Sequence, residues 1–249
     1  MIPKIILFKE CRKLGFLCTY KFEILRIDGF ACPGEWRITM SSKIISRAVI
    51  KRLPRYYRYL SELMEHNIVR ISSKELSERM NVTASQIRQD FNNFGGFGQQ
   101  GYGYNVEYLY SEIGKILGLE RDHNVIIIGA GNVGKALINY PDFAKRGFIF
   151  TAIFDSDPNL VGRKIGNCLV KSVDELETYV KENEVEIAAL TIPKSVAPEV
   201  AGNLVKWGVG AIWNFAPTDL NLPKNVIVEN VHLAESLMRL SYRIKDSEK

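Results

Sequence analysis

A glycine-rich motif between a strand pattern and a helix pattern carries the clearest chemistry in this sequence. The apolar run 125–128 is typical of a parallel strand buried on both faces, and GAGNVG follows it directly, before a helix pattern. In this order, the first glycine makes a tight turn, the second admits a pyrophosphate, and the third allows close helix packing. The motif predicts a dinucleotide site made by Gly129, Ala130, Gly131, Asn132, Val133 and Gly134.

An acidic residue stands where such a site needs one. The strand pattern 148–154 ends at Asp155, about 20 residues after the last glycine. A carboxylate there binds the ribose hydroxyls of the adenosine and repels a 2′-phosphate, so Asp155 favours NAD over NADP. Arg163 and Lys164 lie downstream and could soften this preference, although we interpret them as solvated.

Strand and helix patterns continue to alternate after Asp155. Helices over 174–182 and 195–207 alternate with strands over 186–193 and 210–215, which predicts an α/β fold with a doubly wound parallel sheet. Ligands bind at the carboxyl edge of such sheets. We therefore add the residues at the strand ends, Thr191, Pro193, Asn214 and Phe215, to the predicted site. Whether Thr191 and Asn214 contact a ligand or only satisfy loop backbone stays open.

A second region shows paired helix-start signals. A helix begins near Pro54, and Ser72 with Glu75 forms the capping box of a helix over 73–80. Thr83 and Gln86 repeat that device before a helix over 84–94, and Asn81-Val82 joins the two helices. This arrangement predicts a helix-turn-helix, whose second helix would read bases in the DNA major groove.

The glycine-rich stretch 95–104 then predicts a wing with polar tips. Arg and Gln near the start of a reading helix suit guanine and adenine, and a glycine-rich wing can approach phosphates or the minor groove. The alternative is a small helical domain that packs on a partner protein. The predicted DNA-binding residues are Lys51, Arg52, Ser72, Ser85, Gln86, Arg88, Gln89, Gln99, Gln100 and Tyr102.

Charge and composition agree with two domains of different character. Residues 41–104 hold ten Lys and Arg against five Asp and Glu, whereas residues 105–249 hold sixteen against nineteen. A basic excess confined to one segment favours a nucleic-acid-facing domain, although a solvated surface would also explain it. No apolar run approaches the roughly 20 residues of a membrane span, and we predict a cytoplasmic protein with reduced cysteines and no metal or membrane partner.

The predicted boundaries are an unmatched N-terminal extension over 1–40, a winged-helix domain over 41–122, a Rossmann NAD(H)-binding domain over 123–230, and a C-terminal helix over 231–249. Translation from Met40 would make residues 1–39 an untranslated leader, and a genuine extension or DNA-binding arm is the alternative. Deleting 1–39 should then leave folding, nucleotide binding and DNA binding unchanged. The last helix pattern has Leu233, Leu237, Leu240 and Ile244 on one face, which covers either its own sheet or a partner.

The motifs KRLPRYYRYL, SSKELSERMNVTASQIRQDFNNFGGFGQQGYGYNV, GAGNVGKAL, FDSDPNLVG and WNFAP, in this order, resemble the Rex family of bacterial redox-sensing repressors. The resemblance covers residues 43 to about 245. It implies a homodimer with swapped C-terminal helices, NADH and NAD+ as the sensed cofactors, and release from operator DNA on NADH binding.

The resemblance also implies a conformational switch. In some members it links an arginine, a tyrosine and an aspartate, which by position correspond to Arg58, Tyr140 and His232 here. The histidine departs from the family pattern, since it cannot give Arg58 a fixed carboxylate partner and would repel it when protonated. That latch is therefore absent, rebuilt or pH-dependent in this chain.

Two other functions share parts of this pattern. An NAD-dependent oxidoreductase with an appended DNA-binding domain needs a proton relay beside the nicotinamide. None of the three histidines, His66, His123 and His232, lies in an evident catalytic motif, so we do not predict an enzyme. A regulator that senses another nucleotide such as CoA is the other alternative, and titration with NADH and CoA separates the two.

Overall fold

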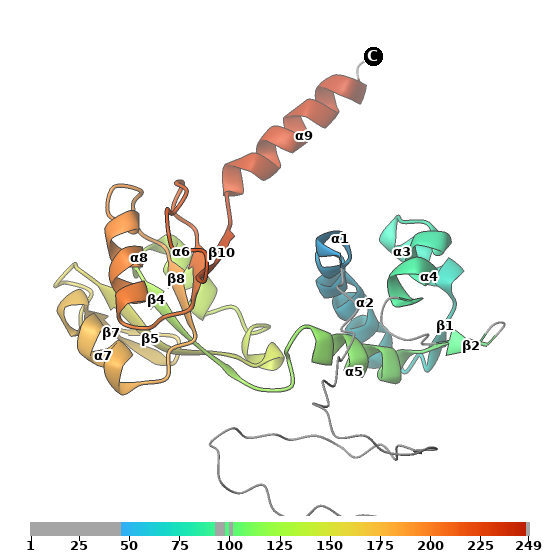
Figure 1. The fold of residues 1–249 in the computed structure, drawn as a ribbon, viewed down its shortest axis with the longest axis horizontal. Helices are drawn as coiled ribbons and strands as arrows, with labels where there is room; N and C mark the ends of the chain where they lie inside the picture. The colour runs from blue at the N-terminus through green and yellow to red at the C-terminus, as the bar shows by residue number, and fades with distance from the viewer. Residues whose placement is uncertain (1–45, 93–97, 100–101, 248–249) are drawn as a thin grey trace, which may run out of the picture. The chain divides into compact units, whose positions relative to one another are not determined.

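The computed structural model describes residues 46–92, 98–99 and 102–247 (Figure 1). Its first part contains five helices and a small antiparallel sheet with strand order β1-β3-β2. The helices are α1 (Arg47–Ile50), α2 (Leu53–Glu65), α3 (Ser73–Met80), α4 (Ala84–Asn92) and α5 (Val106–Ile116), and the strands are β1 (Arg70–Ile71), β2 (Gly98–Gln99) and β3 (Gly103–Asn105).

The helix-turn-helix is confirmed, and its first capping box forms as predicted. Ser72 Oγ accepts a hydrogen bond from the Glu75 N–H (3.1 Å), and Glu75 Oε2 accepts one from the Ser72 N–H (2.8 Å). The second box is only half formed, so this part of the prediction is wrong. Thr83 Oγ1 caps the Gln86 N–H (3.1 Å), but the Gln86 amide donates to Asp90 (2.8 Å). A buried carboxylate one turn away attracts that amide more strongly than the backbone of Thr83 does.

The predicted wing corresponds to β2 and β3, and β1 adds a third strand that the sequence analysis did not assign. Ile71 pairs with Tyr104 across β1 and β3. The inner faces of α2 to α5 form one core with this sheet, so the wing is anchored to the helices. Gln100 and residues 93–97 lie outside the described residues. The core residues are Val49, Leu53, Tyr56, Leu60, Leu63, Ile71, Leu76, Met80, Ile87, Phe91, Val106, Leu109 and Ile113.

The second part is the predicted doubly wound sheet. Its strand order is β10-β9-β8-β4-β5-β7-β6, parallel throughout except for β6. Counted along the chain without β6, this is the 3-2-1-4-5-6 order of a dinucleotide-binding Rossmann fold. The strands are β4 (His123–Ile128), β5 (Phe148–Asp155), β6 (Lys164–Ile165), β7 (Cys168–Ser172), β8 (Ile187–Leu190), β9 (Ala211–Asn214) and β10 (Ile227–Asn230).

Helices cover the two faces of this sheet unequally. On one face, α7 (Leu176–Glu182) and α8 (Ala197–Lys206) pack on β4, β5, β8 and β9. On the other face, α6 (Asn132–Ile138) covers β4 and β5 through Leu137 and Ile138. Two short 3-10 turns, η1 (Ala144–Arg146) and η2 (Val173–Glu175), complete the fold.

The sheet keeps an uncovered apolar hollow. The chain passes from β9 to β10 through residues 215–226 without a helix. A cavity of about 380 Å³ lies over the strands there, with an almost entirely apolar lining. It is lined by Val125, Phe143, Phe148, Phe150, Ile187, Ala211, Ile212, Trp213, Ile227 and Glu229.

The last helix, α9 (Leu233–Ser247), runs away from the sheet after β10 (Figure 1). None of its residues is buried, and Leu237 is 67% exposed although its face is apolar. The described chain therefore contains both an uncovered apolar helix and an unfilled apolar hollow. In the part of the chain that the structure describes, no helix has the length and apolar character to cross a bilayer.

Candidate nucleotide site and DNA-binding surface

The three glycines of the motif meet three different steric demands. Gly129 has φ +104°, and a Cβ there would lie 2.6 Å from the Thr191 carbonyl oxygen. A Cβ at Gly134 would overlap the Gly129 carbonyl oxygen, so this glycine allows α6 to pack against the turn. A Cβ at Gly131, by contrast, would have no protein atom within 4 Å. The space in front of Gly131 is open, which fits the close approach of a pyrophosphate.

Asp155 lies at the carboxyl end of β5, beside the glycine loop. Its Oδ2 accepts a hydrogen bond from the Ala130 N–H (2.6 Å), and its Oδ1 accepts one from the Asp157 N–H (2.8 Å). The carboxylate thus holds the loop against the strand end where the ribose of a dinucleotide binds. Ribose contact by Asp155 stays a prediction, and the geometry agrees with it.

A cavity of about 410 Å³ opens at this edge of the sheet. Five of the predicted cofactor residues line it: Gly129, Gly131, Asp155, Thr191 and Pro193. The sequence analysis missed the others, which are Ile128, Ser156, Val173, Ile192, Val196, Glu199 and Val200. Apolar side chains from η2 and α8 thus face the glycine loop across the cavity. Most of these residues lie inside or directly beside predicted strands and helices, where their positions in the sequence do not show that they face a ligand.

Thr191 and Asn214 both hold loop backbone. The Thr191 hydroxyl donates to the Gly129 carbonyl (2.7 Å) and so ties β8 to the glycine turn. Asn214 is fully buried; its amide donates to Thr218 O and Asn230 Oδ1 (both 2.8 Å), and its Oδ1 accepts from the Ala216 N–H. Asn214 and Phe215 do not line the cavity. Ligand contact by Asn214 and Phe215 therefore stays a prediction, whereas the hydrogen bonds of Asn214 give it a direct structural role.

The reading helix presents the expected surface. Ser85, Arg88 and Gln89 are exposed on α4, at the spacing of one helix face, while Ile87 and Phe91 on the opposite side are buried. The Arg88 guanidinium donates to Ser73 Oγ (3.0 Å), which holds it over the start of α3. This face of α4 is free of core packing and can meet a groove.

The other predicted DNA-binding residues differ in exposure and in their hydrogen bonds. Lys51 is exposed on the segment before α2, Tyr102 is 71% exposed at the wing, and Ser72 spends its hydroxyl on the α3 cap. Arg52 and Gln86 are partly buried, and both donate to Asp90. The side chains of Gln99 and Gln100 lie outside the described residues.

The three switch positions have separate partners within the chain. The Arg58 guanidinium lies 5.2 Å from the centre of the Tyr59 ring, and the Tyr140 hydroxyl lies 3.5 Å from Asp142 Oδ2. His232 Nε2 lies 3.9 Å from Oδ1 of the exposed Asp219. The described chain alone does not bring the three side chains together, and their common role stays a prediction.

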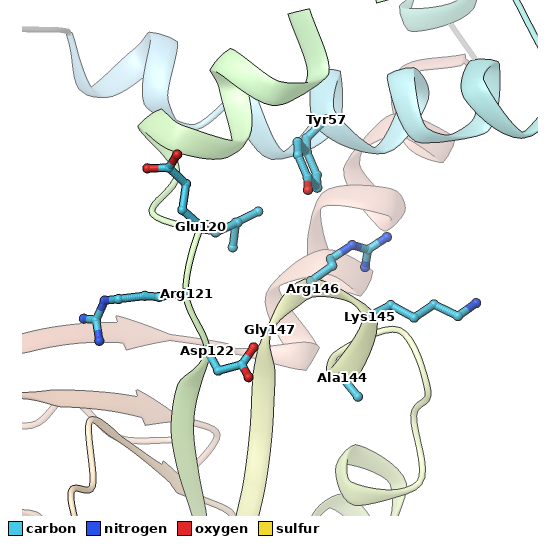
Figure 2. A pocket seen from close by; sticks show the side chains of 9 residues that line it. Tyr57, Glu120, Arg121, Asp122, Ala144, Lys145, Arg146 and Gly147 are labelled. Carbon is cyan, nitrogen blue, oxygen red and sulfur yellow. The ribbon is translucent and has the colours of Figure 1, made fainter. Parts of the chain in front are cut away.

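A separate cavity of about 460 Å³ lies where the chain enters the sheet after α5 (Figure 2). Charged side chains dominate it, and none of the predicted site residues lines it. Its lining is Tyr57, Leu119, Glu120, Arg121, Asp122, Ala144, Lys145, Arg146 and Gly147. In the part of the chain that the structure describes, no cluster of His, Cys, Asp and Glu could hold a metal ion.

Comparison with known proteins identifies the family. One family model, described as "Putative DNA-binding protein N-terminus", matches residues 44–92, and another, described as "CoA binding domain", matches residues 120–218. The redox-sensing transcriptional repressor Rex of Clostridioides difficile (strain 630) is 57% identical over 207 residues, which are 83% of this chain and 99% of that protein. The chain belongs to the Rex family.

Other Rex proteins agree closely. Rex of Caldanaerobacter subterraneus subsp. tengcongensis is 59% identical over 210 residues, 84% of this chain and 94% of that protein. The crystal structure of the Rex-family repressor RSP with beta-NAD+ and operator DNA matches with a TM-score of 0.78 and 56% identity, over 82% of this chain and 94% of that one. The structure of RSP with beta-NADH matches with a TM-score of 0.76 and 54% identity, over 82% and 96%.

Proposed function

We propose that this chain is a transcriptional repressor that binds operator DNA and is released when NADH binds. The observation that carries the proposal is the presence, in one chain, of an exposed reading face on α4 and a Rossmann loop with open space at Gly131. The matched Rex-family repressor is recorded with operator DNA and with both NAD+ and NADH. The cytoplasm is the compartment that this role requires.

A protein can sense NADH against NAD+ by binding the two with different affinities, without catalysing a reaction. Oxidised nicotinamide carries a positive charge that reduced nicotinamide lacks, so a dry site penalises the oxidised form through charge desolvation. Coupling between two ligands of one protein is typically about 1–3 kcal/mol. The two half-sites of an operator lie at a fixed separation. If NADH closes the dimer and changes the spacing of its two reading helices, NADH binding and operator binding oppose each other.

Direct binding tests the nucleotide assignment against its alternative. We expect the purified chain to bind NADH more tightly than NAD+, and both more tightly than CoA, when each is titrated by calorimetry. The comparison with CoA matters because the matching family model bears that name. Saturable binding of CoA alone would overturn the assignment of the sensed nucleotide.

The exposed helix α9 supports a homodimer. One face of α9 is apolar and 53–67% exposed, and it consists of Leu233, Leu237, Leu240 and Ile244. An exposed apolar patch of this kind marks an interaction surface. The sheet hollow beside Trp213 offers an apolar surface that no helix of the described chain covers. We infer that α9 of each subunit packs on the partner, in the swapped arrangement that the family resemblance implies.

Leu237→Glu is expected to convert the dimer into a monomer and to weaken operator binding by at least about tenfold, because one subunit then reads a single half-site. Tyr242→Glu is the matched control, since helical periodicity places it on the opposite side of α9 and it is also exposed. Sedimentation analysis and operator binding are the measurements. A Leu237→Glu protein that stays dimeric would contradict the proposed role of α9.

His232→Asp tests the unusual switch position. If His232 meets Arg58 in the dimer, the imidazole gives the guanidinium no carboxylate partner. A carboxylate at position 232 would pair with Arg58 and strengthen the conformation that brings the two together, so His232→Asp should shift the NADH concentration for half-release. The exposed Asp219 lies beside His232 within the chain, so Asp219→Asn is the control for a local ion pair.

The measurement is the NADH concentration for half-release of the wild type, His232→Asp and Asp219→Asn at one pH. Equal values for the wild type and His232→Asp would show that His232 only precedes α9. An equal shift from Asp219→Asn would assign the effect to the local pair.

A further inference from the structure

A completely buried carboxylate lies at the centre of the DNA-binding domain. Asp90, on the inner side of α4, is 0% exposed and accepts four hydrogen bonds from three side chains. Arg52 donates through Nε to Oδ2 and through Nη2 to Oδ1, both at 2.7 Å. The Tyr56 hydroxyl donates to Oδ2 (2.7 Å), and the Gln86 amide donates to Oδ1 (2.8 Å).

These bonds keep the carboxylate ionised. Burial alone would raise the pKa of Asp90, but hydrogen bonds from Arg52, Tyr56 and Gln86 outweigh it and hold the pKa below its usual range. Stability alone does not require such a group, because well-packed apolar side chains commonly replace a buried ion pair without loss. A contribution to stability alone therefore does not explain why the domain buries Asp90 and its partners.

Asp90 binds two side chains that the sequence analysis predicts to contact DNA, Arg52 and Gln86. Arg52 lies 38 residues before Asp90, at the start of α2, and Gln86 lies one turn before it on α4. The bidentate pair fixes the plane of the Arg52 guanidinium, and it uses only the Nε and Nη2 edge. The Nη1 group takes no part in this pair, and the Arg52 side chain keeps 29% exposure.

We propose that Asp90 is a positioning residue for DNA recognition, which holds Arg52 as a preformed clamp for a DNA phosphate and fixes α4 beside it. A guanidinium suits this task because its planar fork can bind a carboxylate with one edge and a phosphate oxygen with the other. Fixing the fork before binding lowers the entropy lost on contact. This inference rests on the proposed DNA-binding function and adds the residue that organises it.

Two models predict opposite effects of Asp90→Asn on DNA affinity. Asp90→Asn removes a negative charge close to the predicted DNA surface and should then strengthen binding to any duplex. If Asp90 positions Arg52, the same change weakens operator binding, because the asparagine amide cannot accept both arms of the fork. Arg52→Lys provides a second test, since lysine keeps the charge and loses the bidentate geometry.

The experiment measures the affinity of the full-length variants for the operator duplex of the related RSP repressor and for a scrambled duplex, at one salt concentration. We expect Asp90→Asn and Arg52→Lys each to weaken operator binding by about tenfold or more. Calorimetric NADH binding should be unchanged, because the Rossmann residues are intact. Arg55→Lys, three residues along α2 and exposed, is the matched control and should stay within about twofold of the wild type.

The double variant separates anchoring from two independent contacts. If Asp90 acts through Arg52, the variant with both Asp90→Asn and Arg52→Lys binds the operator no more weakly than the single variant with the lower operator affinity. Folded variants that bind as tightly as the wild type, or additive losses, would overturn the inference. If Asp90→Asn fails to fold, Arg52→Lys still tests the bidentate geometry, because Tyr56 and Gln86 still satisfy the carboxylate, and wild-type operator affinity of Arg52→Lys would overturn the inference. A wild type that binds no operator would refute the proposed function, and the inference with it.

Discussion

Gly131→Val is expected to give a repressor that stays on operator DNA at NADH concentrations that release the wild type. The fold has room for the new side chain, since no protein atom lies within 4 Å of a Cβ at this position. The same space is where the pyrophosphate approaches the backbone. We expect NADH affinity to fall by about 100-fold or more, equivalent to about 2.7 kcal/mol, with operator affinity unchanged.

Two other glycines serve as comparisons for Gly131→Val. Gly202→Val is the matched control, because a Cβ at Gly202 on α8 also meets no atom within 4 Å and this residue does not line the nucleotide cavity. Gly134→Val should instead disrupt the domain, since its Cβ overlaps the Gly129 carbonyl. Calorimetric NADH titration and operator release are the measurements. A folded Gly131→Val protein released by the same NADH concentration would remove this loop from the binding site.

Arg88→Ala is expected to abolish the preference for operator over scrambled DNA while leaving NADH affinity intact. Arg88 is exposed on the reading face of α4, and its only hydrogen bond among the described residues is to Ser73. A bidentate arginine contact with a guanine is worth about 1–3 kcal/mol of discrimination. The loss should therefore be about tenfold to 100-fold in operator affinity, and smaller on scrambled DNA.

A matched change separates base reading from charge. Arg79→Ala removes the same charge from an exposed position on α3, so it should weaken operator and scrambled duplexes equally. Affinities for both duplexes at several salt concentrations are the measurement. An Arg88→Ala protein with wild-type operator preference would show that another residue reads the bases.

Local signals in the sequence were sufficient for the parts of the fold that depend on neighbouring residues. Ser72 and Glu75 cap α3 because both lie within one turn. The glycine motif is equally local, and the turn at Gly129 and the packing at Gly134 follow from the missing Cβ atoms. Short edge elements, such as β1 and β6, have two residues each and carry no periodicity that a sequence can show.

The candidate sites were predictable only where one segment supplies the chemistry. Asp155 follows from its distance to the glycines, whereas Val173 and Glu199 reach the same cavity from η2 and α8, and only the folded sheet brings them there. Asp90 was missed for a similar reason. Its partner Arg52 is 38 residues away, and an acidic residue in a mainly polar helix looks solvated until the helices pack.

Operator binding during titration with NADH and NAD+ tests the central claim most directly. The wild-type chain should release the operator duplex as NADH rises, and NAD+ at the same concentrations should leave it bound. Adding NAD+ together with NADH should move the release to higher NADH concentration, since both compete for one loop. Binding that is indifferent to NADH, or equal release by NAD+, would contradict a repressor that senses the NADH/NAD+ ratio.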